Sequence, residues 1–246
     1  MFGGPIPGLE NPGKLLRLAA RTEADGVLAS PWAISRLAEE MGQMAFIARL
    51  DGGMTSLGPR YDQYWNVGTV EQAVRLGAEM VALNVFIGGE NEPEMLKKLG
   101  LTAEACEQWG IPLMAEMIPA AELKHHFGVS ERSHRESAGL GEPVSIASRI
   151  GAEYGGDIIK TVFSGNLEEF RRTILNSTVP VLLAGGPKTG SDTELLTMVK
   201  ECLDAGAAGL VIGRNVWQRT RIEGMIAALC ALTHEDASIE EALDLL

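Results

Sequence analysis

Hydrophobic and polar positions along the chain alternate between short apolar runs and longer segments with a helical period. Seven runs read as strands: Gly26–Ser30, Ala45–Leu50, Met80–Ile87, Pro112–Ile118, Asp157–Val162, Val179–Ala184 and Gly209–Ile212. Because these runs are almost continuously apolar, we expect strands that are covered on both faces, as in a parallel sheet.

Capping residues mark the ends of the helical segments. Asn11-Pro12 and Ser30-Pro31 each place an N-cap residue before a proline at the first helical position. Thr69 has Gln72 three residues later, which is the spacing of a capping box. Four glycines follow helical segments and favour the left-handed C′ position: Gly77, Gly110, Gly155 and Gly206.

The repeat of strand, helix and glycine predicts a single (β/α)8 TIM-barrel domain over residues 1–246. A doubly wound open sheet is the alternative. The first predicted element, however, is a helix at about Pro12–Thr22, and Met1–Glu10 contains three glycines and two prolines. Such a segment is a poor strand. We therefore expect the first barrel strand to be degenerate, within Met1–Ile6, or to be missing from this chain.

Composition narrows the classes of partner. The 246 residues carry a net charge of −12, so we expect no nucleic acid or anionic membrane as partner. No apolar run approaches the roughly 18 residues of a membrane span, and Met1–Pro5 lacks the features of a signal peptide. Cys106, Cys202 and Cys230 lie in apolar helical segments and are expected to be core thiols of a reduced compartment. These features favour a cytoplasmic protein.

Lys160 is the one charge well inside an apolar strand, and it shares a face with Ile158 and Val162. Loss of hydration lowers the pKa of such an amine and frees it to attack carbonyl groups. The alternative is a lysine that extends out of the strand end or pairs with a carboxylate. Glu116, late in its own strand, would be a buried carboxylate near the barrel mouth if it faces inward.

Two glycine-rich loops follow the last two predicted strands, at 185–189 and 213–215. Glycines let backbone N–H groups approach an anion, and TIM barrels commonly hold phosphate at these two places. Arg214, and with it Lys188, would supply positive charge. Ordinary tight turns between strand and helix are the alternative.

Two longer loops are candidates for parts that cover a ligand. Pro119–Gly141 contains three of the four histidines, His125, His126 and His134, in a spacing that matches no zinc site. A surface excursion or an oligomer contact is the alternative for this loop. Asp51–Gly68 carries the aromatic residues Tyr61, Tyr64 and Trp65.

With these residues in view, the chain resembles the archaeal-type class I (DhnA/DeoC-like) aldolase family. That family includes fructose-bisphosphate aldolases, aminodideoxyheptulosonate synthases and the enzymes that break down phosphorylated autoinducer-2. The similar segments are Gly4–Leu9, Thr55–Pro59, Val67–Glu71, Asp157–Thr161, Ala184–Lys188 and Gly213–Gln218. The resemblance implies that Lys160 forms an imine. It also implies that a substrate phosphate is bound by Gly185, Gly186, Gly213 and Arg214.

The chain departs from the family at two places. It lacks the Asp-His-Gly that ends the family's first strand, and Glu116-Met117-Ile118-Pro119-Ala120 stands where the aldolases have Trp-x-Tyr-Pro-Arg. Ile118 therefore replaces the family's proton-transfer tyrosine. The autoinducer-2 branch also lacks this tyrosine. The pattern is thus compatible with a Schiff-base enzyme, while it disfavours ordinary fructose-bisphosphate cleavage.

The sequence predicts a class I aldolase-type lyase that makes or breaks a C–C bond of a small phosphorylated keto compound. Lys160 and Glu116 are the expected catalytic residues, with a histidine of the Pro119–Gly141 loop as another candidate acid or base. Two alternatives stay open, a thiolase-like acyl transfer on a phosphorylated dione and a non-catalytic phosphosugar-binding barrel. We expect no metal and no organic cofactor, and the resemblance implies a homo-oligomer.

Overall fold

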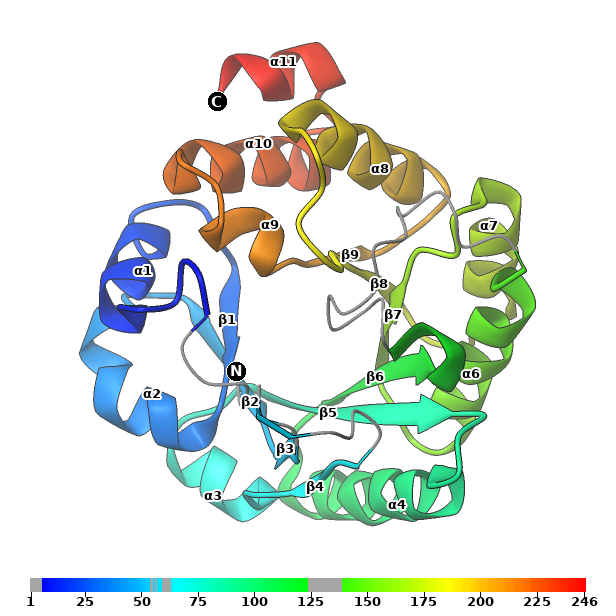
Figure 1. The fold of residues 1–246 in the computed structure, drawn as a ribbon. Helices are drawn as coiled ribbons and strands as arrows, with labels where there is room; N and C mark the ends of the chain where they lie inside the picture. The colour runs from blue at the N-terminus through cyan, green and yellow to red at the C-terminus, as the bar shows by residue number, and fades with distance from the viewer. Residues whose placement is uncertain (1–5, 54, 56, 59–62, 124–138) are drawn as a thin grey trace.

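A computed structural model describes residues 6–53, 55, 57–58, 63–123 and 139–246, and it shows a parallel sheet curled inside a ring of helices (Figure 1). The strands are β1 (Gly26–Ala29), β2 (Ala45–Arg49), β5 (Met80–Ile87), β6 (Leu113–Pro119), β7 (Ile158–Val162), β8 (Val181–Ala184) and β9 (Gly209–Val211). They pair in chain order, all parallel. A doubly wound sheet reverses its strand order at a switch point, so that alternative is wrong. The TIM-barrel prediction is confirmed, with seven strands in the sheet over the described residues.

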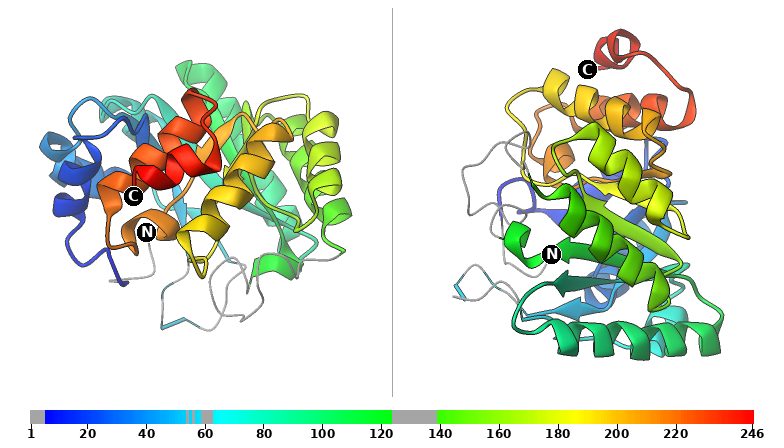
Figure 2. Two further views of the ribbon diagram at one scale, coloured as in Figure 1. Left: turned by 90° about the horizontal axis from the view of Figure 1, so that it is seen from above. Right: turned by 90° about the vertical axis from the view of Figure 1, so that its right-hand side faces the viewer.

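The helices lie outside the sheet and cover its outer face (Figure 2). They are α1 (Pro12–Ala19), α2 (Pro31–Leu37), α3 (Val70–Arg75), α4 (Glu92–Trp109), α6 (Gly141–Glu153), α7 (Leu167–Asn176), α8 (Asp192–Asp204), α9 (Arg214–Trp217), α10 (Ile222–His234) and α11 (Ile239–Asp244). The described residues also include two 3-10 turns, η1 (Ala38–Glu40) and η2 (Ala120–Glu122). Among the described helices, none has the length and apolar character needed to cross a membrane.

The predicted helix ends agree with the structure. The side chains of Asn11, Ser30 and Thr69 each accept a hydrogen bond from the backbone N–H three residues later, at 2.9, 3.2 and 3.1 Å. The φ angles at the predicted C′ glycines are all positive: 79° at Gly77, 64° at Gly110, 95° at Gly155 and 107° at Gly206. Local chemistry alone therefore fixes where these helices begin and end.

The two edges of the sheet, β1 and β9, are not paired with each other in the part of the chain that the structure describes. Met1–Pro5, which holds most of the expected degenerate strand, lies outside the described residues. On the outer side of the two edges, α1 packs against α10 (Figure 1). The space between β1 and β9 is thus bounded by two helices, and it opens into the interior of the barrel.

A short antiparallel ribbon was not predicted. β3 (Asp51–Gly52) pairs with β4 (Trp65–Asn66) at the two ends of the Asp51–Gly68 loop. Runs of two residues are too short to give a strand pattern in the sequence. The ribbon holds Asp51 next to the end of β2, which becomes important for the site.

The three cysteines are buried and unpaired, as expected for core thiols. Burial raises the pKa of the Cys106 thiol to about 12 and that of Cys230 to about 11. Thiols in that state are poor nucleophiles at neutral pH, because the thiolate is the reactive form.

Candidate active site

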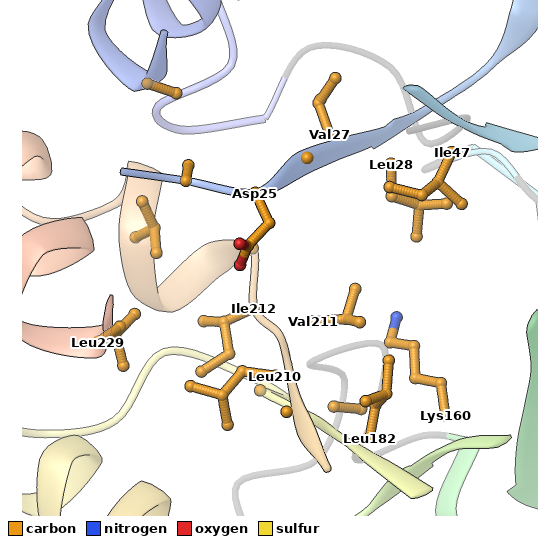
Figure 3. A pocket seen from close by; sticks show the side chains of 18 of the residues that line it. Asp25, Val27, Leu28, Ile47, Lys160, Leu182, Leu210, Val211, Ile212 and Leu229 are labelled. Carbon is orange, nitrogen blue, oxygen red and sulfur yellow. The ribbon is translucent and has the colours of Figure 1, made fainter. Parts of the chain in front are cut away.

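A cavity of about 580 Å³ lies inside the curl of the sheet (Figure 3). All six predicted site residues line it: Glu116, Lys160, Gly185, Gly186, Gly213 and Arg214. Along three strands the lining residues are two positions apart, namely Ile47 and Arg49 on β2, Met114 and Glu116 on β6, and Leu182 and Ala184 on β8. This period of two means that these side chains point into the barrel, while the residues between them face the helices.

The cavity continues into the space between the two sheet edges. Val27 and Leu28 on β1 lie across from Leu210 and Val211 on the β9 side, and the Lys160 side chain projects toward this space from its strand (Figure 3). These walls are mostly apolar. Asp25 also lines the cavity, apart from Lys160 (Figure 3), whereas Arg49, Glu116 and Arg214 act electrostatically on Lys160.

Lys160 and Glu116 occupy paired positions in the register of β7 and β6. The Nζ atom of Lys160 lies 2.7 Å from Oε1 of Glu116, and the two side chains are 9% and 2% exposed. Burial lowers the pKa of the Lys160 amine, Glu116 opposes this, and Arg49 and Arg214 lower it further. The sequence analysis left two interpretations of Lys160 open, a reactive amine or a partner of a carboxylate. The structure shows the carboxylate partner, in buried surroundings that lower the pKa of the amine.

Glu116 also connects Lys160 to a longer series of buried ion pairs. Its Oε2 atom contacts Nη2 of Arg49, at the end of β2. Nη1 of Arg49 lies 3.6 Å from Oδ1 of Asp51, and Oδ2 of Asp51 lies 2.7 Å from Nζ of Lys98 on α4. Five charged side chains, Lys98, Asp51, Arg49, Glu116 and Lys160, are therefore joined in one series. We refer to it as the buried charge chain.

Lys98 and Asp51 are anchored at the far end of this chain. Asp51 is fully buried and accepts a hydrogen bond from the backbone N–H of Asn84 at 2.8 Å. Lys98 donates to the carbonyl oxygen of Asn84 at 2.6 Å and to that of Tyr64 at 3.5 Å. Burial lowers the pKa of Lys98, and Asp51 opposes this.

Arg49, Asp51 and Lys98 were missed as site residues in the sequence. Arg49 is the penultimate residue of the apolar run Ala45–Leu50, a position where a charge is typical of a strand that emerges into solvent. The signal that could have found it is its place at the carboxyl end of a barrel strand, where TIM-barrel sites are built. Asp51 follows two residues later, in the same region.

Among the described aromatic residues of the Asp51–Gly68 loop, Tyr64 reaches the cavity. It is 7% exposed, and its ring packs edge-to-face against Phe86 with centroids 5.1 Å apart. Burial, together with the negative charges of Asp51 and Glu116, raises the pKa of its phenol, which therefore keeps its proton. The structure leaves Trp65 exposed, and Tyr61 lies outside the described residues.

The two glycine loops meet at one side of the cavity. The φ angle of Gly186 is +62°, a backbone conformation that favours glycine. A Cβ atom at Gly185 would lie 2.9 Å from Cγ2 of Ile212, so the β8 loop and the end of β9 approach closely. Arg214 begins α9 beside them, and burial lowers the pKa of its guanidinium while Glu116 opposes this.

Asn215, which was not predicted as a site residue, joins the two glycine loops. Its Nδ2 atom donates to the carbonyl oxygens of Gly185 at 2.9 Å and Pro187 at 2.7 Å. Its Oδ1 atom accepts the backbone N–H of Thr189 at 2.8 Å, and the residue is fully buried. The relative placement of the two loops is therefore fixed by one amide side chain.

Some residues that the sequence analysis singled out do not line this cavity. Lys188 lines a second, smaller cavity of about 210 Å³ together with Arg219. Ile118 is fully buried in the core and does not line the main cavity. The histidines of the Pro119–Gly141 loop lie outside the described residues. Across the described ranges, no group of three His, Cys, Asp or Glu side chains is arranged to hold a metal.

The sequence matches known proteins over most of its length. The model of the DeoC/LacD aldolase family matches residues 2–219. The 2-amino-3,7-dideoxy-D-threo-hept-6-ulosonate synthase of Halobacterium salinarum is 35% identical over 240 residues, which cover 98% of this chain and 85% of that protein. An uncharacterized aldolase of Saccharolobus solfataricus is 30% identical over 253 residues, covering 99% and 89%.

Solved structures agree with these matches. An archaeal fructose 1,6-bisphosphate aldolase has a TM-score of 0.79 and 30% identity, covering 92% of this chain and 84% of that one. A second structure of an archaeal fructose-1,6-bisphosphate aldolase has the same TM-score and identity and covers 91% of this chain and 84% of that one. In that structure the catalytic lysine is covalently bound to the carbinolamine intermediate of the substrate.

Proposed function

The chain belongs to the DeoC/LacD family of aldolases, enzymes that make or break C–C bonds, and we propose that Lys160 is the residue with which it forms an imine. One observation carries this proposal. The amine of Lys160 lies buried in the cavity, 2.7 Å from the Glu116 carboxylate, among surroundings that lower its pKa. An uncharged amine is the form that attacks a carbonyl group.

The proposed substrate is a small keto compound that carries a phosphate. The Gly185–Gly186 turn and the Gly213–Arg214 turn line the same cavity as Lys160, and Asn215 holds the two turns together. Backbone N–H groups and the Arg214 guanidinium suit phosphate oxygens. A phosphate held there would fix the ketone against Lys160, so binding energy remote from the reacting carbon is used for positioning.

The reaction begins with attack of the Lys160 Nζ lone pair on the ketone carbon. An N–C bond forms, the C=O π electrons move to oxygen, and the oxygen takes up a proton to give the carbinolamine. Loss of water then gives the iminium. When the adjacent C–C bond breaks, its electron pair moves into the iminium to form an enamine, and the proton of the β-hydroxyl group leaves as an aldehyde forms. The reverse sequence makes the bond.

Glu116 is the proposed proton carrier for the carbinolamine steps. It lies within hydrogen-bond distance of Nζ, so it can take the proton that the attacking amine loses and return it to the departing hydroxyl group. Ile118, which stands where the aldolases have a tyrosine, is buried in the core and cannot carry a proton. Among the described residues, the acid and base work is therefore assigned to Glu116 and Lys160, and a histidine of the Pro119–Gly141 loop stays a further candidate from the sequence.

Reductive trapping tests the proposal. The protein is incubated with dihydroxyacetone phosphate and sodium borohydride, and intact-protein mass is measured for the wild type, Lys160→Ala and Lys200→Ala. Lys200 is a surface lysine paired with Asp204 and Asp236, so its variant controls for general loss of an amine. The expected result is one stable adduct in the wild type and in Lys200→Ala, and none in Lys160→Ala. No adduct in the wild type with any ketose phosphate would rule the proposal out.

Two further arms address the alternatives. Formation of an acyl-CoA when coenzyme A is supplied with a phosphorylated dione would favour acyl transfer. Binding of a phosphosugar that is unchanged in Lys160→Met, without imine formation, would favour a non-catalytic barrel. The homo-oligomer and the cytoplasmic location stay predictions of the sequence, and light scattering and cell fractionation would check them.

A further inference from the structure

The buried charge chain contains more basic than acidic side chains. Lys98, Arg49 and Lys160 are basic, whereas Asp51 and Glu116 are acidic, and consecutive members contact one another. The five side chains are between 0% and 12% exposed. Water therefore compensates little of their charge, and an unbalanced charge in such a place is costly.

Arg49 is the positive charge that the two carboxylates of the buried charge chain leave unbalanced. Without it, Lys160 with Glu116 and Lys98 with Asp51 would form two complete ion pairs, at 2.7 Å each. With Arg49 present, both carboxylates are shared, because its guanidinium contacts Glu116 and lies 3.6 Å from Asp51. An arginine side chain does not lose its proton in a protein. The balance is therefore restored when one of the two lysines gives up a proton.

The surroundings of the two lysines differ. Nζ of Lys98 has three acceptors, which are Oδ2 of Asp51 at 2.7 Å and the carbonyl oxygens of Asn84 and Tyr64 at 2.6 and 3.5 Å. Three acceptors match the three N–H groups of an ammonium ion. Nζ of Lys160 has a single ion-pair partner among the described residues, Glu116. The proton is thus held more firmly at Lys98 and is lost more easily from Lys160.

We propose that Arg49 is a positioning residue that keeps the Lys160 amine uncharged by sharing the negative charge of Glu116. The inference rests on the imine-forming role proposed for Lys160, and it adds the residue that keeps the amine of Lys160 reactive. On the side of Arg49 away from Glu116, Asp51 and Lys98 hold the guanidinium in place. Both of these side chains are hydrogen-bonded to the backbone of Asn84.

The other groups that face this pair do not replace Arg49. Arg214 lies across the cavity at the start of α9 and acts on Lys160 in the same direction, but it stands beside the glycine turns, where a phosphate would neutralise it. Tyr64 lies on the side of Asp51, Arg49 and Glu116 and is uncharged. Asn84 on β5, paired in register with Glu116, carries no charge.

The test is the pH dependence of adduct formation with dihydroxyacetone phosphate and borohydride. The rate rises with pH as the Lys160 amine loses its proton, so the midpoint reports its pKa. In Arg49→Met the midpoint is expected to move to higher pH by about one unit or more, because Glu116 then stabilises the ammonium ion alone. Arg49→Gln, which keeps a hydrogen-bond donor but no charge, should move in the same direction. Arg49→Lys should stay near the wild type at neutral pH.

The outcomes separate this inference from the proposed function. A wild-type protein that forms no adduct contradicts the function itself. A wild-type adduct at Lys160, together with unchanged midpoints in both Arg49→Met and Arg49→Gln, overturns the role of Arg49 alone. Circular dichroism and thermal melting confirm that each variant is folded. A purely structural role predicts lower melting temperatures with the midpoint unchanged, and it does not predict recovery of the rate at high pH.

Discussion

Lys160 and Glu116 face each other across neighbouring parallel strands, paired in register and with Nζ 2.7 Å from Oε1. Strand pairing fixes the two backbones, and the period of two turns both side chains into the barrel. The distance between amine and carboxylate therefore depends on the sheet itself and not on a loop. A proton can pass between them without movement of the backbone.

Replacement of Glu116 by glutamine should separate the two roles of this carboxylate. Glu116 raises the pKa of Lys160, so in Glu116→Gln the midpoint of adduct formation is expected to move to lower pH, opposite to the shift in Arg49→Met. Turnover should fall by about 10²-fold or more, since the proton carrier is lost. A pH profile of trapping and a kcat measurement on the same samples check this. Unchanged kcat would contradict the assignment of Glu116 as the proton carrier.

Loss of Arg214 should affect phosphorylated substrates far more than unphosphorylated ones. In Arg214→Met, kcat/KM for a ketose phosphate is expected to fall about 10- to 100-fold, the effect of a charge-assisted hydrogen bond. Trapping with unphosphorylated dihydroxyacetone should change little. Arg171→Met, on the exposed face of α7, is the matched control. An equal loss with both ketones would mean that Arg214 does not recognise the phosphate.

Asn215 should be important for stability as well as for phosphate binding. Asn215→Ala removes four hydrogen bonds between the two glycine loops, in a fully buried position. We expect a loss of about 2–4 kcal/mol in the free energy of unfolding, together with a raised KM. Asn176→Ala, which removes one exposed contact with Ser145, should cost under about 0.5 kcal/mol. Chemical denaturation measures both, and equal losses would contradict the account.

Replacement by alanine is expected to change stability in opposite directions at two glycines. A Cβ atom at Gly213 would overlap ring carbons of Trp217, so Gly213→Ala is expected to lower stability by about 1–3 kcal/mol and to weaken phosphate binding. A Cβ atom at Gly100, within α4, would meet nothing within 4 Å. Gly100→Ala should therefore raise stability by about 0.5–1 kcal/mol. Thermal melts of both variants test the contrast, which fails if both change in the same direction.

The sequence allowed the prediction of features that depend on neighbours along the chain. Caps at Asn11, Ser30 and Thr69 need only a side chain and a backbone three residues away. Lys160 could be found because a charge in the middle of an apolar strand is unusual. The glycine loops could be found because their composition and their place after the last two predicted strands can both be read from the sequence.

The charge chain could not be predicted in the same way. Arg49 and Glu116 are 67 residues apart, and Lys98 and Asp51 are 47 residues apart. Their contacts depend on the register between strands and on the packing of α4 on the sheet, and a single sequence states neither. The role of Asn215 depends likewise on how closely two loops approach. The sequence therefore predicted Lys160 but not the charged residues that surround it.

Peptide mapping of the reduced adduct tests the central claim most directly. The structure contains two lysines in the buried charge chain, Lys98 and Lys160, and the account states which of them reacts. After reduction with borohydride in the presence of dihydroxyacetone phosphate, tandem mass spectrometry is predicted to find the added three-carbon phosphate on Lys160. An adduct on Lys98, or one spread over surface lysines, would contradict the account.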